Sequence, residues 1–145
     1  MYKEIIFHID VNSAYLSWEA VHRCNEEGEA RDLRDIPSVV GGDMSKRHGV
    51  VLAKSIPAKK YGIQTGEPLQ QAFKKCPDLV SVPPRHDLYF EYSEALIKIL
   101  REYSPTLEQT SIDEAFLEMH GFYTTYEEAV KGAYLLKDRV RDDLG

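Results

Sequence analysis

The sequence has few cysteines, no long apolar run and an excess of acidic residues. Its two cysteines, Cys24 and Cys76, lie far apart, and no CxxC pair occurs. This pattern excludes a disulfide scaffold, argues against a cysteine zinc site and favours a reducing, cytoplasmic location. No apolar segment approaches the roughly 18 residues of a membrane-spanning helix, so no membrane partner is expected.

The composition is otherwise that of an ordinary globular domain, with 43% hydrophobic and 29% charged residues over 145 positions. The net charge is −6, but its distribution is uneven. Residues 43–75 hold two acidic and seven basic side chains, 7 − 2 = +5, the basic ones being Lys46, Arg47, Lys54, Lys59, Lys60, Lys74 and Lys75. A solvated helix face explains such a segment, and so does a site for a polyanion such as a triphosphate.

Local patterns predict an α/β (α+β) fold. Residues 2–10 form a short, nearly continuous apolar run that ends in Asp10, which is typical of a buried strand. Further strands are expected at 36–40, 49–53, 79–82, 107–110 and 115–119, a turn at 41–45, and helices at 13–25, 57–61, 69–75, 88–103 and 126–144. The last helix would be buried better with one more strand, so we expect an N-terminal part of a longer protein.

Three acidic residues stand at strand ends or turns. Asp10 closes the first predicted strand, and Asp113 with Glu114 lies at the tip of the later hairpin. If that strand lies beside the hairpin, three carboxylates converge and require a cation, for which Mg²⁺ is the usual choice. Paired ions about 3.5–4 Å apart serve nucleotidyl transfer. Solvated acids at turns are the alternative interpretation.

Three segments add a resemblance to a known family: HIDVNSAYLSWEA, SIDEAFLEM and GVVLAKSIPAKKYGIQTGEPLQQAFKKCP. They resemble the metal-binding and fingers motifs of the Y-family translesion DNA polymerases, the DinB and ImpB/MucB/SamB group. The resemblance implies a polymerase palm, with a ferredoxin-like sheet that carries helices on one face. It places the palm at 1–10 and 81–145 and an inserted fingers subdomain at 11–80. The last palm strand, the thumb and the little finger would lie outside the chain.

The resemblance also implies a metal site. Asp10, Asp113 and Glu114 match the catalytic carboxylates that hold two Mg²⁺ ions, for which Mn²⁺ can substitute. The main-chain carbonyl of Val11 would bind the ion that accompanies the nucleotide. The second acid that often follows in the first motif is replaced by Asn12.

The resemblance further implies a nucleotide site. Backbone N–H groups of the segment Asn12, Ser13, Ala14 and Tyr15 would hold phosphate oxygens at a helix start. Tyr15 falls at the steric-gate position, where a bulky ring excludes the ribonucleotide 2′-hydroxyl; a plain core aromatic is the alternative. The usual Tyr-x-Ala-Arg run is here Ile56 to Lys59, so Lys59 can supply positive charge, but without an arginine's fork. Two alternatives follow: the triphosphate affinity is reduced, or Lys54 or Lys60 supplies it instead.

The implied activity is template-directed DNA synthesis past damaged bases by the full-length protein, a DNA-directed DNA polymerase. Its partners would be primer-template DNA and a dNTP, with a sliding clamp bound outside this chain. The 145 residues alone are expected to be inactive. Alternatives are an aspartate-dependent phosphatase of the haloacid-dehalogenase type, which needs an acid where Asn12 stands, a nucleotidyl cyclase, and a catalytically quiet binding module.

Overall fold

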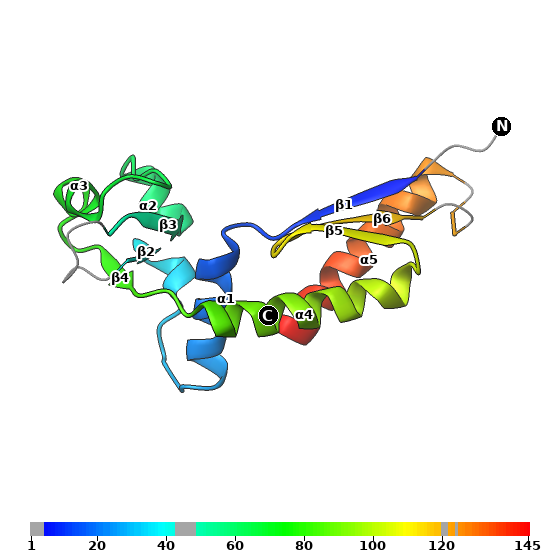
Figure 1. Ribbon diagram of the computed structural model, residues 1–145, viewed down its shortest axis with the longest axis horizontal. Helices are drawn as coiled ribbons and strands as arrows, with labels where there is room; N and C mark the ends of the chain where they lie inside the picture. The colour runs from blue at the N-terminus through cyan, green and yellow to red at the C-terminus, as the bar shows by residue number, and fades with distance from the viewer. Residues whose placement is uncertain (1–4, 43–48, 120–121, 124) are drawn as a thin grey trace. The chain divides into compact units, whose positions relative to one another are not determined.

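The computed structural model describes residues 5–42, 49–119, 122–123 and 125–145 (Figure 1). Predicted strand residues 2–4 and turn residues 43–45 lie outside these ranges, as do Lys46 and Arg47. The chain divides into two compact units, one formed by residues 1–11 and 90–145 and the other by Asn12–Tyr89. Among the described helices, none has the length and apolar character needed to cross a membrane.

The first unit contains an antiparallel sheet of three strands in the order β1-β6-β5. These strands are β1 (Ile6–Asp10), β5 (Leu107–Ser111) and β6 (Glu114–Glu118). The predicted hairpin and its place beside the first strand are confirmed, with strand ends shifted by one residue. The prediction that the first strand already includes Ile5 was wrong, because the ladder with β6 begins at Ile6.

Helices cover one face of this sheet, as predicted (Figure 1). Side chains alternate along a strand, so Phe7, Ala115 and Leu117 point to one face and are buried there. They pack against α4 (His86–Tyr103) and α5 (Tyr126–Leu144) in one core. The helical residues of this core include Leu96, Ile97, Ile99, Leu100, Ala129 and Leu136. The opposite face, which carries His8 and Asp10, stays exposed.

The second unit has its own sheet, in the order β3-β2-β4. Strand β2 (Ser38–Gly41) pairs antiparallel with β3 (Val51–Lys54) and parallel with β4 (Val80–Val82). Three helices and one 3₁₀ turn complete it: α1 (Ala14–Asn25), η1 (Leu33–Asp35), α2 (Ile56–Lys60) and α3 (Leu69–Lys75). The turn η1 lies between the predicted helix at 13–25 and the predicted strand at 36–40, where no element was predicted. The core of this unit joins Val39, Val51, Ala58, Ile63, Leu69, Ala72, Cys76 and Leu79.

Local chemistry fixes the short helix α2. Ser55 caps it, because its hydroxyl oxygen accepts hydrogen bonds from the Ala58 N–H at 3.1 Å and the Ser38 N–H at 3.0 Å. Gly62 follows the end of the helix with φ +82°, a conformation that favours glycine. Ser55 thereby ties β2 to the start of α2.

Candidate functional site

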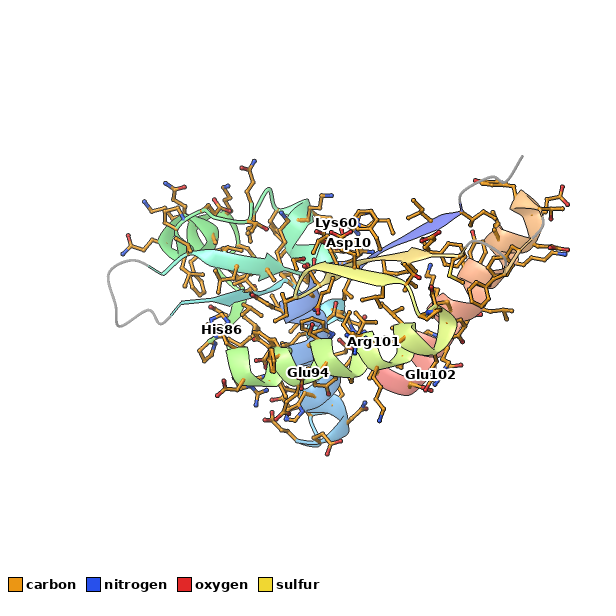
Figure 2. All side chains as sticks on the ribbon, turned by 45° about the vertical axis from the view of Figure 1, so that its right-hand side comes forward. Asp10, Lys60, His86, Glu94, Arg101 and Glu102 are labelled. Carbon is orange, nitrogen blue, oxygen red and sulfur yellow. The ribbon has the colours of Figure 1, made fainter. Side chains whose placement is uncertain are left out.

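Two of the predicted carboxylates lie opposite each other in the first unit. Asp10, labelled in Figure 2, ends β1. In the antiparallel register it stands opposite Glu114, the first residue of β6. Directly opposite residues in such a ladder project to the same face. Neighbouring side chains agree, since His8 Nε2 lies 3.8 Å from Glu114 Oε1 and the His8 ring stacks on Phe116 at 4.4 Å. Asp10 and Glu114 therefore share the helix-free face of the sheet.

Asp113 lies in the turn that joins β5 to β6. Its main-chain oxygen accepts a hydrogen bond of 3.0 Å from the Val11 N–H, which extends the contact with β1 beyond Asp10. Its carboxylate Oδ1 accepts a hydrogen bond of 2.8 Å from the Ser111 hydroxyl. The backbone thus brings the three acidic residues to one end of the sheet, while the Asp113 side chain bonds to Ser111.

The donor atoms at this end of the sheet are oxygens, which suit a hard cation such as Mg²⁺. Within the described residues, however, no three His, Cys, Asp or Glu side chains are close enough together to hold a metal ion. Two like charges on opposite ladder positions repel, and the Asp113 carboxylate has a competing donor. The residues fit a divalent cation in chemistry, and all three could bind it only if side chains rotate.

The predicted phosphate-binding segment lies at the start of α1, in the second unit. Ser13 adopts φ 46° and ψ 53°, the left-handed region that only this non-glycine residue occupies among those described. Its side chain makes no capping hydrogen bond, and no acidic residue stands in the first helical turn. The Ser17 hydroxyl donates to the Asn12 carbonyl at 2.9 Å and steadies the segment. The first N–H groups of α1 thus have no side-chain cap from Ser13.

Tyr15 is partly exposed on α1. Its ring stacks on Tyr89, with centroids 4.6 Å apart and planes inclined by 18°. The imidazole of His86 meets the Tyr15 ring edge-on, at 5.8 Å and 86°. One side of the Tyr15 ring is therefore packed, and the steric-gate role stays a prediction.

The two predicted basic groups are placed differently. Lys54, at the end of β3, donates a long hydrogen bond of 3.5 Å from Nζ to the Thr65 hydroxyl. Lys59 lies on the exposed side of α2, and Ile56 beside it is 74% exposed. Both lysines remain accessible to an anion. Among the described contacts, neither makes a hydrogen bond to a buried group that would fix the direction of its amino group.

A buried carboxylate in the second unit was not anticipated from the sequence. Glu19 on α1 is fully buried and accepts hydrogen bonds from Arg85 Nε and Nη2 at 2.9 and 2.6 Å, from the Tyr89 hydroxyl at 2.7 Å and from Arg23 Nε at 3.0 Å. We call Glu19, Arg23, Arg85 and Tyr89 the Glu19 cluster. Its one sequence signal is the spacing of Glu19, four residues after Tyr15 and three after buried Leu16, which places it on their side of the helix.

The protonation states in the Glu19 cluster follow from these contacts. Burial alone would raise the pKa of Glu19, but hydrogen bonds from Arg85, Tyr89 and Arg23 outweigh it, so the pKa lies below its usual value. Burial and the bond to Glu19 raise the pKa of Tyr89. Glu19 is therefore ionised and the Tyr89 hydroxyl is a donor at neutral pH. Trp18 is also buried, and its ring centroid lies 6.3 Å from that of Tyr89.

The fold is that of known polymerase structures. The chain is similar to an insertion ternary complex of Dbh DNA polymerase, with a TM-score of 0.81, 23% identity, and coverage of 95% of this chain and 39% of that one. It is also similar to DinB from Sulfolobus solfataricus, with a TM-score of 0.77, 22% identity, and coverage of 94% and 38%. Identities this low support a common fold and no more.

Sequence comparison defines the family. The model of the impB/mucB/samB family matches residues 9–145, and the chain belongs to this family. It is 49% identical over 142 residues to DNA polymerase IV of Clostridium acetobutylicum, which covers 98% of this chain and 35% of that protein. It is 41% identical to DNA polymerase IV of Moorella thermoacetica, over 94% of this chain and 32% of that protein. The chain thus spans about a third of these relatives.

Proposed function

We propose that this chain is the palm-and-fingers part of a DNA-directed DNA polymerase, which adds nucleotides from dNTPs to a primer 3′-hydroxyl, also opposite damaged template bases. The observation that carries this proposal is the ladder position of Asp10 opposite Glu114, with Asp113 bonded to the neighbouring Val11 through the backbone. These residues lie within the family domain, and the curated relatives are named DNA polymerase IV.

In this proposal, Asp10, Asp113 and Glu114 would hold two Mg²⁺ ions, or Mn²⁺ in their place, together with the Val11 carbonyl. Such ions lower the pKa of the attacking hydroxyl and offset the charge on the departing pyrophosphate. The protein's part is to keep the acids on adjacent strands, where the β1–β6 ladder fixes two of them. Ser111 holds the third carboxylate until a cation competes for it.

The nucleotide is proposed to bind at the start of α1. The N–H groups of Asn12, Ser13, Ala14 and Tyr15 face no acidic side chain in the first turn and can donate to phosphate oxygens. Lys54 and Lys59 add positive charge as point charges. The Tyr15 ring excludes a 2′-hydroxyl by steric clash, which is selection through repulsion.

We propose that residues 1–10 and 81–145 form the palm and residues 11–80 the fingers. Within the described residues, β1 pairs only with β6. Beside its other edge lies a groove of about 380 Å³, which β1 lines together with Tyr126, Ala129, Val130 and Ala133 of α5. A further palm strand from the rest of the protein would cover this apolar groove.

The remaining two thirds of the protein would supply the thumb and little finger, which grip duplex DNA. Recruitment by a sliding clamp stays a prediction for that part. A cytoplasmic location is proposed because Cys24 and Cys76 are free thiols, as expected in a reducing compartment.

Metal-dependent primer extension by the full-length protein tests the proposal. Asp113→Ala should lower the extension rate by about 10²–10³-fold, the usual cost of losing a group that stabilises transition-state charge. Asp138→Ala is the matched control, because Asp138 is an exposed acid on α5 that pairs only with Arg141 among the ion pairs described.

The 145-residue chain alone should extend no primer. Equal activity of wild type and Asp113→Ala would remove the carboxylates from the mechanism, and hydrolysis of a generic phosphoester would favour a phosphatase.

A further inference from the structure

The ring of Tyr15 packs against a second aromatic ring that is itself fully buried. Tyr89 is fully buried and stacks on Tyr15 at 4.6 Å, with an angle of 18° between the rings. His86 touches both rings edge-on, at 5.8 Å from Tyr15 and 6.0 Å from Tyr89. Figure 2 marks His86 at the start of α4. The orientation of Tyr15 therefore depends on where Tyr89 is fixed.

The Glu19 cluster fixes Tyr89. The Tyr89 hydroxyl donates to Glu19 Oε1 at 2.7 Å, and Arg85 donates to both oxygens of the same carboxylate. Arg85 also donates from Nη1 to Glu27 at 2.6 Å, which anchors its guanidinium from the other side. Hydrogen bonds to ionised groups are shorter and stronger than neutral ones, so the phenol has one well-defined position.

We propose that Glu19, Arg85 and Tyr89 are positioning residues for sugar selection, which act by holding the Tyr15 ring where it clashes with a ribonucleotide 2′-hydroxyl. This inference rests on the proposed function, since it takes Tyr15 to be the steric gate. A gate works by repulsion, and a ring that can tilt or slide by about 1 Å admits the extra oxygen. The stacked, hydrogen-bonded Tyr89 blocks that movement.

The chemistry of the cluster suits a permanent brace rather than a switch. Burial raises the pKa of Tyr89, and the bonds around Glu19 lower the pKa of that carboxyl. The donor and the acceptor therefore keep their roles throughout the neutral pH range. All the residues concerned lie in the unit Asn12–Tyr89, so the brace is internal to one compact unit.

The experiment measures single-nucleotide incorporation by the full-length protein, as the ratio of kcat/KM for a dNTP to that for the matching rNTP. Tyr89→Phe removes one oxygen atom and keeps the ring, and it should lower this ratio by about five- to tenfold, the typical net effect of one hydrogen bond. The change should come from faster rNTP incorporation, with kcat/KM for the dNTP kept within about threefold. Glu19→Gln should act in the same direction. Tyr134→Phe is the control, because Tyr134 is 63% exposed on α5.

A coupling test separates positioning from general loosening of the fold. Tyr15→Ala should abolish most of the discrimination, and in that background Tyr89→Phe should change the ratio no further. A persistent effect of Tyr89→Phe without the gate ring would overturn the positioning role. The positioning role would also be overturned if Tyr15→Ala lowers the ratio of kcat/KM for dNTP to that for rNTP but Tyr89→Phe changes this ratio no more than Tyr134→Phe does.

If Tyr15→Ala itself leaves the ratio unchanged, the steric gate of the proposed function is wrong, and the inference that rests on it is overturned too. Circular dichroism melting monitors the folding of every variant of the full-length protein. Should Glu19→Gln fail to fold, the Tyr89→Phe comparison decides the matter.

Discussion

Substitution of Arg85 should lower the free energy of unfolding of the second unit, because Arg85 neutralises the buried carboxylate of Glu19. The Glu19 side chain is 0% exposed and receives four hydrogen bonds, two of them from Arg85. Arg85→Met keeps the aliphatic stem and deletes both bonds. Breaking a buried ion pair from one side costs about 3–5 kcal/mol, because the remaining charge stays buried. Since Arg85 is 33% exposed and Arg23 still pairs with Glu19, we expect about 3 kcal/mol.

Urea unfolding followed by Trp18 fluorescence is the assay, because Trp18 is buried 6.3 Å from the Tyr89 ring. The matched control is Arg141→Met, since Arg141 is 67% exposed and pairs only with exposed acids on its own helix among the described contacts. Arg141→Met should lower the free energy of unfolding by no more than about 0.5 kcal/mol. The double variant Glu19→Gln with Arg85→Met should recover part of the stability, as no unpaired charge is then buried.

The pH dependence gives the decisive signature. In Arg85→Met, burial of a less compensated Glu19 raises its pKa, so the carboxyl can take up a proton as the pH falls toward 4. The stability difference from wild type should therefore shrink between pH 7 and pH 4. Equal losses in Arg85→Met and Arg141→Met, or a difference that does not change with pH, would refute this account of the cluster.

Three further outcomes follow from single contacts. The folded chain lowers the pKa of Glu19 and raises that of Tyr89. The contribution of these two groups to stability should therefore be constant between their ordinary pKa values of 4.5 and 10.0, should fall at lower pH as Glu19 protonates, and should fall at higher pH as Tyr89 ionises. A pH series of urea midpoints, with Tyr89→Phe compared with wild type, measures the part due to Tyr89. Ser55→Ala should cost about 1–2 kcal/mol in the same assay, because it removes the α2 cap and a buried partner of the Ser38 N–H. Asp10→Asn should raise the thermal stability of the first unit by about 0.2–1 kcal/mol, since it removes a like-charge pair across the ladder, and circular dichroism melting checks this.

Sequence patterns identified the elements that are defined by local chemistry. Helix α5 spans 126–144 as predicted, because the Thr125 hydroxyl caps it by accepting from the Glu128 N–H at 3.1 Å. Helix α3 likewise matches its predicted range, and Pro77 follows it closely. The hairpin that carries Asp113 was also found, since alternating apolar residues flank a polar turn.

Long-range pairings could not be predicted in the same way. Glu19 looks like an ordinary solvated acid on an amphipathic helix, and its main partner, Arg85, lies 66 residues further along the chain. The parallel pairing of β2 with β4 also joins distant segments without a local signal. Asp10 and Asp113 were expected because they stand at a strand end and a turn and also match family motifs. The residues of the Glu19 cluster have neither signal.

The acidic residues Glu19 and Asp10 have opposite environments: Glu19 is surrounded by hydrogen-bond donors, whereas Asp10 faces another acid. Glu19 is surrounded by donors, so its charge is satisfied internally and its neutralisation in Glu19→Gln should destabilise the protein. Asp10 faces Glu114 on an open surface, and its neutralisation in Asp10→Asn should stabilise the protein. A fold that keeps an unfavourable pair of like charges gives up stability at that place, which is typical of a site that binds a ligand. The opposite sign of these two substitutions therefore distinguishes the structural acid from the proposed catalytic one without any activity assay.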